Sequence, residues 1–240
     1  MRKQFDILVL SGQKAKPQIE DAALGWFFEN DFSNILPELD AEWTILLHPD
    51  ALLTRDFLNA TANLVTDFPY ADAFAPRIVS DGKTVSSGYL LDTKKGFVEE
   101  FCTNKKNEMR HVASLSPFCG IYSTRLLKSL GSFDSDFKTD VRFFDLGLRA
   151  LHLGASLFAV PFLQIETKKI SETPVPLSKK EIARTYYKDL DFSSFLKFAI
   201  RHPAFAMSIF DEKKSLDEKS LRATELSRLT PEMLEKVTVK

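Results

Sequence analysis

The chain has 240 residues, 44% of them hydrophobic, which is enough for one sizeable core and predicts one domain with an appendage. Its 32 Lys and Arg residues nearly balance 33 Asp and Glu residues, so the overall charge gives no reason to expect nucleic-acid binding. The two cysteines lack metal-ligand spacing, and the apolar run after the first residues is too short for a signal peptide or a membrane span. We therefore expect a cytoplasmic protein with free thiols.

The first fifty residues predict two buried strands with helical structure between them. Residues Ile7–Leu10 form an apolar run closed by Ser11-Gly12, typical of a parallel-sheet strand that ends at a loop. Between residues 19 and 39 apolar side chains recur at roughly helical spacing, which predicts one or two helices. Trp43–Leu47 is a second buried strand, and it ends at His48-Pro49-Asp50 because proline cannot donate to a sheet ladder.

The middle of the chain predicts a helix and a hairpin. The helix begins at Thr54, a suitable N-cap, and ends at Asp67-Phe68-Pro69. Residues 73–79 and 84–88 predict two strands joined by the Asp81-Gly82 turn.

The next segment alternates strands and helices. We expect a strand within residues 112–123, a helix over Thr124–Leu130 closed by Gly131, a helix from Phe143 to Leu153, and a strand over Ser156–Phe162. Together the elements predict an α/β fold, with a mixed sheet because of the hairpin.

The composition changes to charged helical stretches near Ile170, so we expect a first domain over 1–170 and a helical extension over 171–240. An aromatic stripe from Phe192 to Phe210 predicts burial against the core or in a homodimer through the C-terminal helices. Contact with a membrane surface or a lipid acceptor is the less favoured alternative.

Asp50 is the most informative residue for function, because an apolar strand delivers its carboxylate at the carboxyl end of the sheet. Ligands bind at that end of open α/β sheets. A carboxylate there can hold a divalent ion, which in turn neutralises a diphosphate. An ordinary polar turn is the alternative.

Further motifs extend from Ser116-Pro117-Phe118-Cys119-Gly120 through Gly131-Ser132-Phe133-Asp134-Ser135-Asp136-Phe137 to Asp145-Leu146-Gly147-Leu148-Arg149. With the strand before Asp50, they resemble the inverting family-two glycosyltransferases of the GT-A fold, especially their rhamnosyltransferase-like members. The resemblance covers about residues 40 to 165. It implies a mixed sheet flanked by helices on both faces, with an N-terminal half that is shorter here than in the family.

The resemblance also implies a set of binding residues. Asp50 and His48 are expected to hold Mg²⁺ or Mn²⁺ and the nucleotide diphosphate, with Ser11 and Gly12 near the nucleotide. For His48, a polar surface residue is the alternative. Gly120 either lets a sugar approach the backbone or serves strand packing alone.

The expected catalytic base is missing from its family position. Counting back six residues from Arg149 gives Phe143, preceded by Arg142 instead of the Glu of the family, and a phenyl ring cannot accept a proton. Asp134 is expected to organise its turn, and Asp145 to cap a helix and pair with Arg149. Asp136 and Asp140 therefore remain as candidate bases, and Asp140 is preferred.

Two functions follow. The first is a glycosyltransferase that moves a sugar from a nucleotide-sugar donor to a saccharide or lipid-linked acceptor in surface polysaccharide assembly. The second is a catalytically silent relative that serves as a binding or assembly module, which Phe143 and the short nucleotide half favour.

Overall fold

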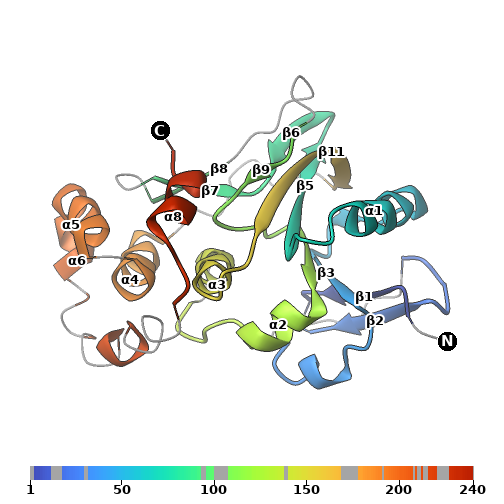
Figure 1. Cartoon of the computed structure of the whole chain (residues 1–240), viewed down its shortest axis with the longest axis horizontal. Coiled ribbons are helices and arrows are strands. Elements are labelled where there is room, and N and C mark those ends of the chain that lie inside the picture. Colours follow the sequence, from blue (N-terminus) through green and yellow to red (C-terminus); the bar gives the residue numbers. More distant parts are fainter. Residues whose placement is uncertain are drawn as a thin grey trace.

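The computed structural model describes residues 3–11, 18–29, 32–92, 96–99, 108–137, 140–168, 178–190, 192–207, 209, 212, 216–220 and 227–239. Within these residues a mixed nine-stranded sheet has helices on both faces, as the sequence predicts (Figure 1). Its strands are β1 (Phe5–Val9), β2 (Leu24–Phe28), β3 (Trp43–Leu47), β4 (Ala51–Leu52), β5 (Ala73–Ser80), β6 (Lys83–Ser86), β9 (Arg110–His111), β10 (Cys119–Ser123) and β11 (Leu157–Thr167).

The order of the strands places the ends of β1 and β3 side by side. Along the sheet the order is β2-β1-β3-β10-β5-β11-β4, with β6 on β5 and β9 on β11. Strands β2, β1 and β3 are parallel, whereas β10 runs antiparallel between β3 and β5. Strands β2 and β3 lie on opposite sides of β1, so the strand order reverses at β1. In open α/β sheets, ligands bind outside the carboxyl ends of the strands at such a point.

The prediction of one or two helices between residues 19 and 39 is wrong. Strand β2 occupies Leu24–Phe28 and pairs with β1 residue by residue, and only the short 3₁₀ helix η1 (Leu36–Glu38) follows. The apolar residues satisfied a helical period, but the aromatic run Trp26-Phe27-Phe28 suits a strand, and pairing with β1 decides the outcome. The N-terminal half therefore has one strand more than expected.

Two layers of side chains form the core, one on each face of the sheet. Leu8 and Leu46 point into the layer beneath α2 (Thr124–Leu130) and α3 (Val141–His152), whereas Ile7 and Ile45 point toward α1 (Arg55–Asp67). This alternation follows from the two-residue period of a strand.

Capping and turn residues determine where several other elements begin and end. Thr54 caps α1 by accepting a hydrogen bond from the Phe57 amide at 3.1 Å. Gly131 ends α2 with a positive φ of 71°. Asp81 and Gly82, with φ of 49° and 72°, form the tight turn of the β5–β6 hairpin.

Strand β11 is longer than the expected Ser156–Phe162, because it continues to Thr167 after a register shift between Val160 and Gln164. The shift surrounds Pro161, which has no amide hydrogen for a ladder bond. Strands β7 (Tyr89–Asp92) and β8 (Gly96–Glu99) form a separate pair.

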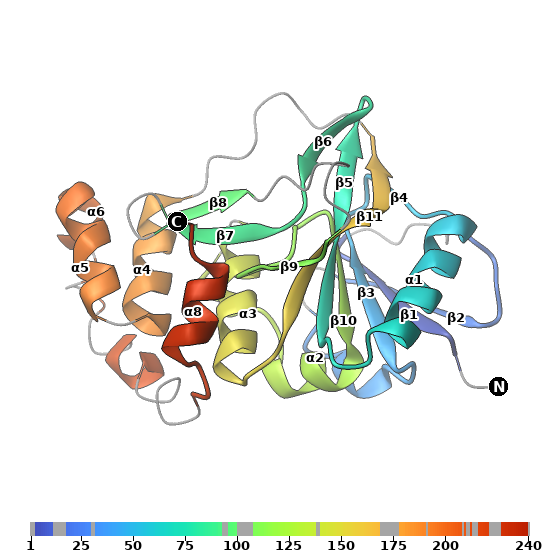
Figure 2. The same cartoon turned by 45° about the horizontal axis from the view of Figure 1, so that its top comes forward.

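The C-terminal extension packs beside α3 as α4 (Lys179–Asp189), α5 (Phe192–Arg201), α6 (Pro203–Met207) and α8 (Pro231–Val237) (Figure 2). The expected restart at Thr230-Pro231-Glu232 is confirmed, since Thr230 caps α8. The boundary near Ile170 falls outside the described residues and stays a prediction. Among the described residues, no helix is both long and apolar enough to cross a membrane.

The aromatic stripe of the extension is only partly buried. Phe195 and Phe198 are buried, as expected, and contact Tyr187 and Tyr186 of α4. The exposed members are Leu196, Ile200 and Phe205. The prediction that they are buried is wrong for this chain alone, because α4 and α6 cover only one side of α5. The side chains of Phe192 and Phe210 lie outside the described residues.

Candidate functional site

The carboxyl ends of β1 and β3 bring three expected residues to one edge of the sheet. Val9 and Leu47 are paired, and the Leu10 amide donates to the Leu47 carbonyl at 2.9 Å. Ser11 therefore follows β1 close to where His48 and Asp50 follow β3. Gly12 lies outside the described residues, so its expected role stays a prediction.

His48 is held by its own turn and by an aromatic neighbour. Its Nδ1 accepts a hydrogen bond from the Asp50 amide at 3.2 Å, and its ring centroid lies 5.2 Å from that of Phe118. Burial lowers the pKa of the imidazole, although the carboxylates of Asp50 and Asp140 oppose this shift. His48 is therefore neutral at pH 7. With Nδ1 accepting, its proton lies on Nε2, which is then available to donate to a ligand.

Asp50 combines a fixed backbone with a solvated side chain. Its carbonyl accepts hydrogen bonds from the Lys168 amide at 2.9 Å and the Thr167 hydroxyl at 3.3 Å, which tie the turn to β11. Its side chain is 57% exposed, and Oδ2 lies 3.7 Å from His48 Nδ1. The turn therefore presents the carboxylate to solvent at the sheet edge, as the sequence predicts.

Asp140 joins this edge from the other half of the chain. It occupies the N-cap position of α3, yet its side chain makes no capping hydrogen bond. The carboxylate is near enough to His48 and Arg142 for their charges to act on it. Burial raises its pKa above the ordinary value, while Arg142 and His48 oppose the change. A half-buried carboxyl group with a raised pKa is a stronger base than an ordinary aspartate.

Arg142 is the residue of this edge that the sequence reasoning missed. Its guanidinium carbon lies 4.7 Å from the ring centroid of Phe133 and 5.3 Å from that of Phe143. The available signal was the charge itself, two residues after an Asp at a helix start.

Phe143 belongs to the core and not to the edge. Its side chain is 2% exposed and packs edge-to-face on Phe133, while its carbonyl accepts a 2.7 Å hydrogen bond from the Ser114 hydroxyl. Gly120 is likewise buried, and a Cβ there would lie 2.8 Å from the Tyr122 ring, which favours the packing explanation.

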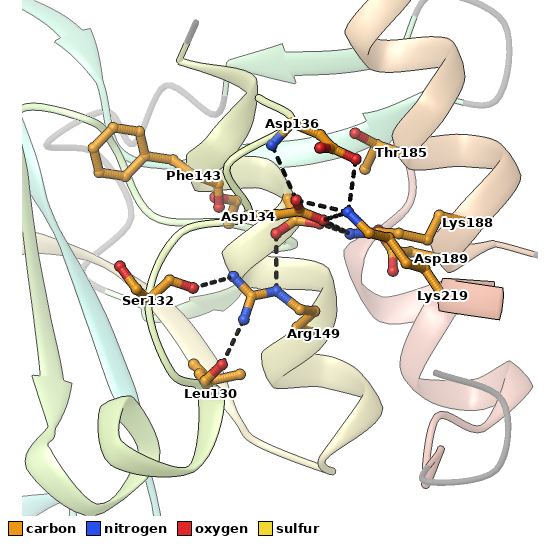
Figure 3. A network of polar contacts seen from close by, with 12 residues as sticks. Leu130, Ser132, Asp134, Asp136, Phe143, Arg149, Thr185, Lys188, Asp189 and Lys219 are labelled. Atoms are coloured by element: carbon orange, nitrogen blue, oxygen red, sulfur yellow. Dashed lines mark hydrogen bonds and ion pairs between the residues drawn. The ribbon is translucent and has the colours of Figure 1, made fainter. Parts of the chain in front are cut away.

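Asp136 is directed toward the C-terminal extension. Its carboxylate pairs with Lys219 at 2.6 Å, and its amide donates to Asp134 Oδ1 at 3.1 Å, so Asp134 organises the turn (Figure 3). The structure thus places Asp140 beside His48 and gives Asp136 a different partner.

Asp145 is not a helix cap, because α3 begins at Val141 and Asp145 lies in its second turn. Its expected pair with Arg149 is present at 2.8 Å, and Lys188 of α4 also bonds it. The Arg149 guanidinium further donates to the carbonyls of Leu130 and Ser132 (Figure 3). This cluster therefore serves to join α3 to the extension.

A divalent ion does not fit this edge well. Asp50 and His48 supply one carboxylate and one imidazole, and the described residues contain no group of three His, Cys, Asp or Glu side chains able to hold a metal. Glu166, a further carboxylate on β11, is exposed. Mg²⁺ and Mn²⁺ favour several oxygen ligands. The nearby charged group is instead the Arg142 cation.

Two cavities lie elsewhere. One of about 490 Å³ separates the α2–α3 connection from the extension, and one of about 610 Å³ separates β9 from α8. Among the described lining residues neither includes Ser11, His48, Asp50 or Asp140. These two cavities are therefore separate from the candidate site.

Comparison with known proteins shows the fold. No protein-family profile matches the sequence, and no curated protein matches it significantly. Similar solved structures include GalNAc-T7 with UDP, GalNAc and Mn²⁺, at a TM-score of 0.55 and 10% identity over 78% of this chain and 48% of that one. S. aureus TarS 1–349 with UDP-GlcNAc has a TM-score of 0.51 and 15% identity over 98% and 84%.

The same TarS fragment with UDP has a TM-score of 0.50 at 13% identity, over 98% of this chain and 83% of that one. This chain spans about half the length of the GalNAc-T7 chain. At these identities the likeness shows the fold, which is the GT-A fold expected from the sequence.

Proposed function

We propose that the chain is a glycosyltransferase that moves a sugar from a nucleotide-sugar donor to a hydroxyl of a saccharide or lipid-linked acceptor. The observation that carries the proposal is the Asp140 carboxylate, which is half-buried, makes no capping bond and lies within electrostatic range of His48, at the edge of the sheet where open α/β folds bind ligands. The solved structures with this fold contain UDP or UDP-GlcNAc, which supports a nucleotide-sugar donor.

In this proposal Asp140 takes the proton of the acceptor hydroxyl as its oxygen bonds to the anomeric carbon. The bond between that carbon and the diphosphate breaks, and the electron pair leaves with the nucleoside diphosphate. Attack opposite to the leaving group inverts the configuration. His48, as a neutral imidazole with its proton on Nε2, donates to a phosphate oxygen, while Ser11 lies near the nucleotide. The role of Gly12 stays a prediction from the sequence.

Metal dependence is the weakest of the expectations from the sequence. Asp50 and His48 would have to hold Mg²⁺ or Mn²⁺ without a third protein ligand, so we assign no step to an ion. The setting in surface polysaccharide assembly, the cytoplasmic location and the rhamnosyltransferase-like specificity remain predictions from the sequence.

Calorimetric titration with UDP, GDP, ADP and dTDP, followed by a donor-hydrolysis assay, tests the function. We expect one nucleoside diphosphate to bind and its sugar derivatives to be turned over. Binding without any turnover would favour the silent binding module, for which Phe143, buried in place of the family's base, is the supporting observation. If none of the four binds, with or without Mn²⁺, the glycosyltransferase proposal fails.

A further inference from the structure

The Arg142 guanidinium makes no hydrogen bond to a carboxylate among the described residues, so it is available to bind an anion from outside the protein. Two aromatic rings hold its guanidinium, and Nε is buried without a hydrogen-bond partner among the described residues. The terminal amino groups also make no hydrogen bond among the described residues, and an anion bound to them would neutralise this cation. The contrast is Arg149, whose guanidinium donates to Asp145, Leu130 and Ser132.

The charges around Arg142 are those of the candidate site. Arg142 and Asp140 lie within electrostatic range of His48, the residue that follows β3. Arg142 also lies in the first turn of the twelve-residue helix α3, whose N-terminus favours negative charge.

We infer that Arg142 binds the diphosphate of the donor and neutralises it as it leaves, in the role that a divalent ion would otherwise have. A planar guanidinium donates two parallel hydrogen bonds to phosphate oxygens, and the contacts with the rings of Phe133 and Phe143 restrict its position in advance. The inference deepens the proposed function and rests on it. The sequence agrees, because the carboxylate expected at this position is replaced by a cation while the site offers no set of three metal ligands.

The test measures binding of inorganic pyrophosphate and of the four nucleoside diphosphates by calorimetry, in EDTA and in Mn²⁺. It compares the unmodified chain with Arg142→Gln and Arg142→Lys, and with Arg125→Gln as a matched control on the exposed surface of α2. We expect binding in EDTA, a loss of about tenfold or more for Arg142→Gln, partial recovery for Arg142→Lys and no change for Arg125→Gln.

The outcomes separate this inference from the proposed function. If binding requires Mn²⁺, or if Arg142→Gln binds as tightly as the unmodified chain, the inference is wrong while the function stands. If pyrophosphate binds through Arg142 and no nucleotide does, the anion site stands and the glycosyltransferase proposal fails. If Arg142 only pairs with Asp140, Arg142→Gln will shift the acid limb of the pH–rate profile upward without weakening binding in EDTA, which also overturns the inference. No binding of any probe in either buffer overturns both.

Discussion

Asp140 and Asp136 lie four residues apart and have different surroundings. Asp140 adjoins His48 and Arg142 in a half-buried setting, whereas Asp136 forms an exposed ion pair with Lys219. A base must be free to accept a proton and close to where the acceptor lies. These surroundings give a physical reason, absent from the sequence alone, to propose Asp140 as the base.

We predict that Asp140→Asn lowers the rate of transfer by about 100-fold or more while the affinity for the nucleoside diphosphate stays within about twofold. The amide preserves the shape of the side chain but removes its basicity. Steady-state kinetics and calorimetry measure the two quantities. Asp136→Asn is the matched control, and we expect it to retain most of the activity. Undiminished transfer by Asp140→Asn would exclude it as the base.

The rate should also depend on pH through Asp140. Burial raises the pKa of this carboxyl group, and the base works only when it is ionised. The rate is therefore full above the pKa in the folded protein and falls as the pH drops through it, at a higher pH than for an exposed aspartate. A pH–rate profile of the unmodified chain checks this, and a rate that is constant down to about pH 4 would contradict it.

At the scale of elements, Lys188 connects α4 to α3. Its Nζ bonds Asp145, lies 3.2 Å from Asp134 and 3.6 Å from Asp189, and its side chain is only 4% exposed (Figure 3). Although burial acts in the opposite direction, Lys219 and Lys188 hold the pKa of Asp134 at about 2. Ion pairs between oppositely charged, largely buried side chains therefore join the extension to the core.

We predict that Lys188→Met lowers the free energy of unfolding by about 3–5 kcal/mol, because it leaves buried carboxylates without their cation. Urea denaturation followed by circular dichroism measures the change. Lys180→Met is the matched control on the same helix, since its pair with Glu212 at 3.1 Å is solvated and should contribute under about 1 kcal/mol. Equal effects of the two changes would show that the buried cluster does not hold α4.

The same cluster should make stability fall with rising pH. Burial raises the pKa of the Asp189 carboxyl from 3.8 to about 8, although Lys188 opposes the shift. Between these values the folded chain keeps a proton that the unfolded chain releases, so stability is full below the lower value and is lost as the pH rises through the upper one. Urea midpoints between pH 5 and pH 8.5 should decline, and Asp189→Asn should flatten the decline, while exposed Asp56→Asn should leave it unchanged.

An element was predicted correctly from the sequence where residues within or next to it specify its structure. Helix α2 and the β5–β6 hairpin were predicted because Gly131 and the Asp81-Gly82 turn specify their own neighbourhoods. Strand β2 was missed because only its pairing with β1 distinguishes it from a helix.

The residues of the candidate site differ in the same respect. The position of His48 and Asp50 at the end of β3 was predicted because that strand is recognisable in isolation, and their roles stay proposals. Arg142 contacts Phe133, which is nine residues earlier in the sequence and is brought close by the turn before α3. No local sequence pattern could therefore predict this contact.

At the scale of the whole molecule, the extension leaves an apolar surface exposed on α5 and α6. Ile200 is 72% exposed, Met207 68% and Leu196 46%, while the opposite side of α5 packs on α4. Exposed apolar side chains gathered on one element indicate a contact surface. The homodimer expected from the sequence would bury them, and we keep this partner as a proposal.

We predict that the chain forms a dimer at micromolar concentration and that Ile200→Asp makes it monomeric, because a charge placed in an apolar interface has to be desolvated without a partner. Size-exclusion chromatography with light scattering measures the mass of each species. Phe162→Asp is the matched control, since Phe162 is 52% exposed on β11, away from the extension, and its replacement should leave the mass unchanged. A monomeric unmodified chain would remove the homodimer. Anionic vesicles should then be tested by co-sedimentation, and binding that is lost in Ile200→Asp would assign the surface to a membrane instead.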